Sequence, residues 1–377
     1  MEQERCYKKF LEENLFPREL KHHNNGCVNF SSSDYLGLST HPLLIERSRA
    51  FLEKFGAGST SSRLVTGNLP VYETLEKKLA QLTGKPAALI LGTGYQTNSS
   101  VLEAILDHRV LGAEPLLFCD RLCHASLFFT TRYLSRLHRF QHNNLNHLNE
   151  LLEKFSDDPR PKFIVAESVY SMDGDQADIL MLIFLAKKHK AFLYIDDAHA
   201  IGVYGSSGLG LASDYAQEID LVMGTFSKAA GSFGGYVACS PVMRDYLINK
   251  CQGLIYSTGL PPAVLGAIDA ALELLPTMKT ERERLLRHAE RVRDFFKKQG
   301  LNCGNSTTHI VPWILGDAEK TLYVSQKLRE KGITATAIRP PSVPKGESRI
   351  RFCLSSAHSD EDIERLMEAI LTVNITT

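Results

Sequence analysis

The sequence predicts an α/β fold in which helices cover both faces of a mostly parallel sheet. From about residue 85, short apolar runs alternate with segments of helical periodicity, as in parallel strands joined by helices. The pattern changes near Pro261–Pro262, where a long helical stretch begins. We therefore expect a large central α/β domain followed by a smaller α+β domain at the C-terminal end.

The expected elements follow from these patterns. Buried strands are predicted at 87–91, 116–119, 163–166, 192–195, 221–223 and 236–239. Leucines and a phenylalanine recur at helical spacing over 145–155, and Asp178 is placed to cap a helix that runs to Lys190. Before the sheet, we expect a helix and then a turn at residues 24–26 that leads into a short strand.

The C-terminal part has its own pattern. It predicts a helix over 284–298, a strand at 310–315, a helix near 322–331, an extended run at 333–338 and a strand at 349–354. Ser359 is the expected N-cap of the last helix, with Asp362 at the capping-box position. The chain is accordingly divided into an N-terminal segment (1–36), a large domain (37–262) and a C-terminal domain (263–377).

The composition argues against several classes of partner. Among 377 residues, Lys+Arg and Asp+Glu both number 43, so no net charge favours nucleic acid or a membrane surface. The longest strongly apolar stretch, 179–186, is too short to span a bilayer, and residues 1–5 do not resemble a signal peptide. The eight cysteines include no CxxC pair, so we expect a cytoplasmic protein with reduced thiols and no bound metal.

Polar residues follow the ends of two predicted strands. Asp196 and His199 lie in an Asp-Asp-Ala-His run after one strand, where a carboxylate can face a cationic ring nitrogen. Lys228 follows the next strand among small residues, and burial there would lower its pKa and make the amine a nucleophile and base. A solvated acidic loop and a surface lysine are the alternative interpretations.

Two further segments suit a phosphorylated, flat ligand. The turn Leu91-Gly92-Thr93-Gly94-Tyr95 follows a strand and opens a helix, where free backbone N–H groups bind phosphate. His124 could stack on a ring, although a core or capping histidine fits as well. The glycines of 202–210 lack the context of a dinucleotide fingerprint.

Together these segments resemble the α-oxoamine synthase family of pyridoxal-phosphate (PLP) enzymes. The resemblance extends from Asn29 to the final helix and implies a fold-type I PLP-dependent transferase. It rests on the motifs at 32–38 (SSDYLGL), 167–174 (ESVYSMDG), 196–199 (DDAH), 225–228 (TFSK) and 256–258 (YST).

The resemblance implies a role for each matching residue. Lys228 would hold PLP as a Schiff base, Asp196 would pair with the ring nitrogen, and His124 would stack on the ring. His199 would bond the phenolic oxygen, with Ser171 nearby. The phosphate would be bound by Gly94, Tyr95 and Thr225, and by Ser257 and Thr258 of a second subunit. A homodimer with shared active sites is therefore implied, although Ser257 and Thr258 could simply cap a helix before Pro261.

The family joins an amino acid to an acyl thioester and releases carbon dioxide. The run 338–351 is most similar to the branch that uses L-alanine and a pimeloyl thioester, carried by coenzyme A or an acyl carrier protein, in biotin biosynthesis. Arg339 would bind the amino-acid carboxylate, unless it forms a surface salt bridge, and Arg18 would serve the acyl substrate. The resemblance implies that Ser33 lies near the substrate, at a position where the family usually has asparagine. Arg349 and Arg351 are expected to alternate along a strand without a substrate role.

Other activities fit the same motifs. Within the family they are glycine C-acetyltransferase, 5-aminolevulinate synthase and a long-chain acyl synthase. Outside it, they are an aminotransferase of the same fold and a non-catalytic PLP-binding protein. Retention of Lys228, Asp196, His199 and His124 disfavours the non-catalytic alternative.

Overall fold

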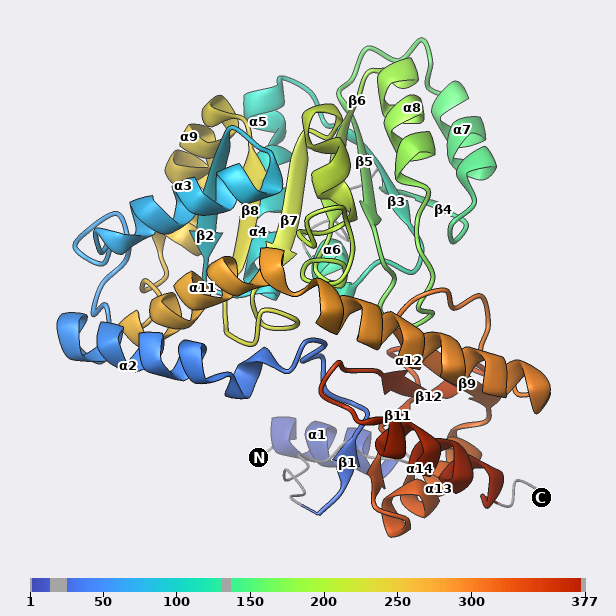
Figure 1. Cartoon of the computed structure of the whole chain (residues 1–377). Coiled ribbons are helices and arrows are strands. Elements are labelled where there is room, and N and C mark those ends of the chain that lie inside the picture. Colours follow the sequence, from blue (N-terminus) through green and yellow to red (C-terminus); the bar gives the residue numbers. More distant parts are fainter. Residues whose placement is uncertain (1, 14–25, 130–136, 374–377) are drawn as a thin grey trace.

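The computed structural model describes residues 2–13, 26–129 and 137–373 (Figure 1). Its largest feature is a seven-stranded sheet with the order β2-β8-β7-β6-β5-β3-β4. The strands β7, β6, β5, β3 and β4 are mutually parallel, and β8 runs antiparallel to both β7 and β2. Their bounds are β2 Ala87–Leu91, β3 Leu116–Asp120, β4 Leu137–Phe140, β5 Lys162–Glu167, β6 Ala191–Asp196, β7 Leu221–Thr225 and β8 Gly235–Cys239.

The six predicted strands of this sheet are confirmed, each to within two residues at either end. The prediction missed β4, one of the two edge strands. His138 and Arg139 interrupt its apolar run, and its first three residues are not fully buried. Positions that are only partly buried tolerate polar side chains, so β4 lacks the continuous apolar pattern of the other strands.

Helices cover both faces of the sheet, as the alternation predicted. Along β2, Ala88 and Ile90 belong to one hydrophobic core, whereas Leu89 and Leu91 belong to a second core on the opposite face. The helices of this part are α2 Pro42–Phe55, α3 Val71–Thr83, α4 Gly94–Ile105, α5 His108–Leu111, α6 Ala125–Phe129, α7 Leu145–Glu153, α8 Ile179–His189, α9 Pro241–Lys250 and α10 Gln252–Ile255. The predicted cap of α8 is confirmed, since the Asp178 side chain accepts a hydrogen bond from Met181 N at 3.0 Å.

The C-terminal part is built on a three-stranded antiparallel sheet with the order β11-β12-β9. Its strands are β9 Ile310–Gly316, β11 Ala337–Ile338 and β12 Ser348–Cys353, and its helices are α11 Pro262–Leu274, α12 Lys279–Lys298, α13 Ala318–Glu330 and α14 Asp360–Leu371. The predicted capping box is present, because Ser359 N and Asp362 N each donate to the other residue's side chain. In Figure 1, α11 and α12 run between the large sheet and this small one.

The N-terminal residues pack against the small sheet and its neighbours. Helix α1 (Glu2–Glu13) comes first, and β1 (Val28–Asn29) later pairs in parallel with β10 (Ile333–Thr334). The carbonyl of Phe30 accepts a hydrogen bond from Cys353 N at 2.8 Å, and that of Tyr35 accepts one from Ser356 N at 2.8 Å. The motif that contains Ser33 and Tyr35 is thereby held against the C-terminal part, while the division into three domains stays a prediction. Among the described residues, no helix is long and apolar enough to cross a bilayer.

Candidate active site

A cavity of about 220 Å³ lies where β5, β6 and β7 end and α4 begins. It brings together residues that are up to 135 positions apart in the sequence. The lining residues are Thr93, Gly94, Tyr95, Asn98, His124, Ser126, Glu167, Asp196, Ala198, His199, Met223, Thr225, Ser227 and Lys228. All four residues predicted to be catalytic, and the three predicted phosphate ligands of the same subunit, are in this set.

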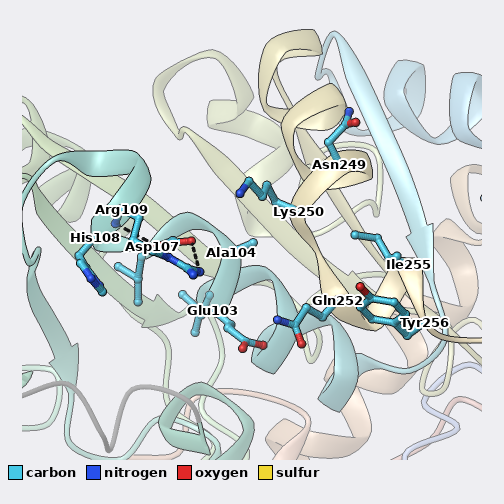
Figure 2. A pocket seen from close by; sticks show the side chains of 12 residues that line it. Glu103, Ala104, Asp107, His108, Arg109, Asn249, Lys250, Gln252, Ile255 and Tyr256 are labelled. Atoms are coloured by element: carbon cyan, nitrogen blue, oxygen red, sulfur yellow. Dashed lines mark hydrogen bonds and ion pairs between the residues drawn. The ribbon is translucent and has the colours of Figure 1, made fainter.

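A larger cavity of about 450 Å³ lies elsewhere, between the end of α4, α5 and the α9–α10 region (Figure 2). Its lining includes the exposed ion pair of Asp107 and Arg109, together with Lys250 and Tyr256. None of the residues that were assigned a catalytic, cofactor-binding or substrate-binding role lines it. We therefore place the candidate active site in the smaller cavity.

One end of the active-site cavity is formed by the start of α4. The Thr93 side chain caps this helix by accepting a hydrogen bond from Gln96 N at 3.0 Å. A Cβ atom on Gly94 would lie 3.3 Å from Thr225 Oγ1, so glycine lets the helix start close to the end of β7. The N-terminus of a helix carries unpaired N–H groups and a partial positive charge, which favour a phosphate.

Asp196 is buried at the end of β6 and is held by two hydrogen bonds. Its Oδ1 accepts from Ala198 N at 2.9 Å, and its Oδ2 accepts from Asn98 Nδ2 at 2.7 Å. The Asn98 amide is itself oriented, because its Oδ1 accepts from the Tyr194 hydroxyl at 2.7 Å. Asn98 was not predicted as a site residue; its position on the helix face that carries Val101, Leu102 and Ile105 was the available signal.

The same asparagine also reaches His124. Asn98 Nδ2 donates to Ser126 Oγ at 2.9 Å, which leaves the Ser126 hydroxyl to donate to His124 Nδ1 at 2.7 Å. Ser126 N also points at Nδ1, at 3.3 Å. With Nδ1 accepting, the proton of a neutral His124 lies on Nε2. Burial lowers the pKa of His124, which favours this neutral form.

His199 is fixed in a similar way by Tyr35. The Tyr35 hydroxyl lies 2.7 Å from His199 Nδ1, and both side chains are buried. Burial and the nearby Lys228 cation hold the pKa of His199 well below its usual range, and burial raises the pKa of Tyr35. Tyr35 is thus the donor, and His199 keeps an Nε2–H that can be donated. The Ser33 side chain lies beside the Tyr35 hydroxyl, so the structure connects Ser33 to the cavity through Tyr35.

Lys228 follows β7 and lines the cavity, between the buried side chains of Phe226 and Ala229. Burial lowers the pKa of its amine to about 8, although the negative charge of Asp196 opposes this shift. At pH 7 about a tenth of such amines are uncharged, compared with far fewer for an ordinary lysine. The amine can therefore act both as a nucleophile and as a base near neutral pH.

Glu167 is a second residue that the sequence analysis did not single out, although it begins the ESVYSMDG motif. It is buried at the end of β5 and accepts a hydrogen bond from His124 N. Burial, followed by the negative charge of Asp196, raises the pKa of Glu167 well above its usual range. A neutral carboxyl group in this position can accept one hydrogen bond and donate another.

The two arginines of β12 have different surroundings. Arg349 is buried and pairs with Asp173 at 2.7 Å and Glu347 at 3.1 Å. Arg351 donates to the carbonyl of Ser171 at 3.2 Å, and its charge contributes to lowering the pKa of Lys228 and His199. The strand prediction is confirmed for both. However, the position of Arg351 near the cavity was not anticipated.

Several predicted ligands lie away from the cavity wall. Arg339 follows β11 and is partly buried, and Ser171 is buried. Ser257 Oγ accepts from Gln96 Nε2 at 2.5 Å, and Thr258 forms a β-bridge with Ser62. These four residues are outside the set that lines the cavity. Arg18 lies outside the described residues.

The fold and this cavity define a fold-type I PLP-dependent transferase, and comparison with known proteins agrees. The family model for class I and II aminotransferases matches residues 25–370. A Gluconacetobacter diazotrophicus protein named 8-amino-7-oxononanoate synthase is 48% identical over 346 residues, 91% of this chain and 87% of its own. A Paramagnetospirillum magneticum protein named "Putative 8-amino-7-oxononanoate synthase" is 55% identical over 345 residues, 91% of this chain and 88% of its own.

Similarity to solved structures supports the same fold and family. Serine palmitoyltransferase from Sphingomonas wittichii superposes with a TM-score of 0.85 at 27% identity, over 91% of this chain and 86% of its own. A serine palmitoyltransferase structure described as containing a PLP internal aldimine has a TM-score of 0.88 at 26% identity, over 99% of this chain and 98% of its own. The chain belongs to the class I and II aminotransferase family, and within it to the PLP-dependent α-oxoamine synthases, which are acyltransferases.

The residues of the cavity fit PLP chemically. A helix N-terminus suits the phosphate, a buried and oriented carboxylate suits a protonated ring nitrogen, and a histidine N–H suits a phenolic oxygen. The amine of Lys228, with its lowered pKa, suits covalent attachment to an aldehyde. The phosphate, ring nitrogen, phenolic oxygen and aldehyde of the cofactor thus have matching groups in one cavity.

Proposed function

We propose that this enzyme condenses L-alanine with a pimeloyl thioester and releases carbon dioxide. The products are 8-amino-7-oxononanoate and the free thiol of coenzyme A or an acyl carrier protein, which places the reaction in biotin biosynthesis. The observation that carries this choice is the name shared by relatives that are 48–55% identical over 91% of the chain.

PLP, when bound, supplies an electron-withdrawing ring that stabilises negative charge on the Cα atom of the amino acid. Asp196, fixed by Asn98 and Ala198, would keep the ring nitrogen protonated. The Nε2–H of His199 would donate to the phenolic oxygen, and His124 would cover the ring face. Lys228, once its covalent attachment is displaced, would remove the Cα proton and later return a proton to that atom.

The carboxylate of the amino acid needs a cation near Lys228. We propose Arg339 for this role, as the resemblance implies, and add Arg351, whose charge already acts on Lys228 and His199. A guanidinium group can hold a carboxylate through two parallel hydrogen bonds. Ser33, which lies beside Tyr35, is proposed to be near the amino acid, and Arg18 near the acyl substrate.

We further propose a homodimer in which each subunit completes the phosphate site of the other. Ser257 and Thr258 do not line the cavity of their own subunit, and the neighbouring Tyr256 is 81% exposed. An aromatic side chain this exposed is a suitable contact for a second copy of the chain. Sedimentation of the PLP-loaded protein tests this, since a monomer with full activity contradicts it.

The substrates are tested by mass spectrometry of the products. The PLP-loaded enzyme is incubated with alanine, glycine or serine against pimeloyl, acetyl, succinyl and palmitoyl thioesters, and carbon dioxide is measured in parallel. We expect product only, or by far fastest, from alanine with the pimeloyl thioester. The variant Lys228→Ala is the negative control, and Lys250→Ala, which changes a lysine outside the active-site cavity, is the matched control.

A second candidate is a synthase for longer acyl chains. It is favoured by the structural similarity to serine palmitoyltransferases, although at only 26–27% identity. Product from serine and the palmitoyl thioester would support it and would contradict the biotin-pathway assignment. Transfer of the amino group without release of carbon dioxide would instead indicate an aminotransferase.

A further inference from the structure

His142 lies outside the active-site cavity but connects two loops that form it. It follows β4 and is hydrogen-bonded on both sides of its ring. Nδ1 lies 3.0 Å from Asp120 Oδ1, and Nε2 lies 3.0 Å from Asp175 Oδ2. Asp120 ends β3, four residues before His124, and Asp175 directly follows the ESVYSMDG motif that starts at Glu167. The histidine thus joins the loop that carries His124 to the loop after β5.

The contacts determine the charge of the ring. A carboxylate only accepts hydrogen bonds, and each ring nitrogen faces one. Both nitrogens can donate only if the imidazole carries two protons, so His142 is a cation between two carboxylates. The Tyr170 ring packs edge-on against it at 4.4 Å between centroids, which limits its movement.

The hydrogen-bond acceptors of the Asp120 carboxylate are all occupied. Asp120 is completely buried, and besides His142 it accepts from Leu122 N at 2.8 Å, Asn143 N at 2.7 Å and the Tyr170 hydroxyl at 3.0 Å. The bond from Leu122 N fixes the turn that leads directly into His124. Loss of the cation would leave a buried carboxylate with one partner fewer at the base of this turn.

The Asp175 end is anchored to the same loop. The side chain of Asn143 donates to Asp175 Oδ2 at 2.8 Å and to the carbonyl of Gln176 at 2.7 Å. Asn143 has a backbone φ of 51°, a left-handed conformation that asparagine tolerates better than most residues. On the cavity side, His124 N donates to Glu167, so the two loops are joined a second time.

We propose that His142 is a positioning residue for the PLP site: as a permanent imidazolium clamp between Asp120 and Asp175, it sets the position of His124 against the cofactor ring. The inference rests on the PLP site and not on the identity of either substrate. Burial alone would lower the pKa of His142, but the hydrogen bonds to Asp120 and Asp175 outweigh it and raise the pKa to about 10. The clamp therefore stays charged throughout the neutral range.

Two variants of His142 test its contacts with Asp120 and Asp175 separately. His142→Asn keeps a neutral donor near the position of Nδ1, facing Asp120, whereas His142→Gln keeps one near Nε2, facing Asp175. The matched control is His147→Asn, because His147 accepts from Gln141 N at 3.0 Å and anchors the same loop without touching Asp120. PLP affinity is measured by fluorescence titration, and the environment of the bound cofactor by its visible absorbance and circular dichroism, all without substrates.

We expect His142→Gln to weaken PLP binding by about tenfold and to change the circular dichroism of the cofactor band. His142→Asn, which breaks only the contact with Asp175, should weaken PLP binding by about threefold, and His147→Asn should match the wild type. Wild-type affinity and spectra in His142→Gln would overturn the proposal. Equal losses in all three variants would also overturn it, since they would indicate general loosening of the loop.

A measurement on the unaltered enzyme covers the case in which His142→Gln does not fold. In protein with ¹⁵N-labelled histidine, the His142 signal should show two protonated ring nitrogens from pH 6 to 9, with assignment from His142→Asn. A neutral His142 ring at pH 7 would overturn the proposal. PLP binding by the wild type in the same samples distinguishes this result from failure of the site as a whole.

Discussion

Replacement of Asp196 by asparagine tests the central electrostatic element of the site. The change removes a buried negative charge that faces the cavity and keeps the shape of the side chain. Removal of one preorganised electrostatic contact in an active site typically costs about 3 kcal/mol of barrier, on the order of a hundredfold in kcat. We therefore expect kcat to fall by about that factor when PLP is saturating.

The structure also predicts a stability cost. Both oxygens of Asp196 accept hydrogen bonds, from Ala198 N and Asn98 Nδ2. The amide of an asparagine would place an NH₂ group against one of these donors, whichever way it is turned. Leaving one buried donor without an acceptor costs about 1–3 kcal/mol of unfolding free energy, which denaturant unfolding of the apoprotein can measure.

Asp197→Asn is the matched control. Asp197 is also fully buried, but its oxygens accept from Ser168 Oγ and Ala212 N, and it does not line the cavity. Burial raises the pKa of Asp197 to about 7, so less charge is lost by its replacement. Both variants should lose stability, and only Asp196→Asn should lose kcat at saturating PLP. Normal turnover in Asp196→Asn, with a loss in Asp197→Asn, would refute this reasoning. It would show that the ring nitrogen pairs with Asp197 and not with Asp196.

Three further predictions follow from other residues. Lys228→Ala should abolish turnover while the far-UV circular dichroism stays unchanged, and normal activity would contradict the assignment of the attachment site. Arg351→Gln should raise the KM for the amino acid and raise the pKa of Lys228 above about 8, because a neighbouring cation is removed; pH-dependent labelling of the amine measures the latter. Arg349→Gln, which breaks the buried pair with Asp173, should lower stability without these effects. Finally, His142 has a folded-state pKa raised to about 10 from about 6.5, so its stabilising contribution is complete below pH 6.5 and is lost as the pH rises through 10. The difference in unfolding free energy between wild type and His142→Asn should therefore shrink between pH 6.5 and 10, and a difference that stays constant would be inconsistent with a charged clamp.

Much of the fold could be predicted because local patterns are sufficient for it. The central strands of a covered parallel sheet must be apolar on both faces, so runs such as 163–166 stand out without knowledge of their partners. The caps at Asp178 and Ser359 are equally local, since each side chain bonds an N–H three residues away. Strand β4 was missed because its first three residues are not fully buried, so polar side chains are tolerated there.

The sequence by itself determined which residues carry chemistry in motifs, such as Asp196, His199 and Lys228, because each follows a recognisable strand end. Only the tertiary structure decided which side chains act on one another. Asn98 meets Asp196 across 98 positions, Tyr35 meets His199 across 164, and Arg351 lies near the cavity while Arg349 is buried against Asp173. Such contacts depend on the packing of distant elements, and a hydrogen bond needs atoms within about 3 Å, a precision that no local pattern of residues contains.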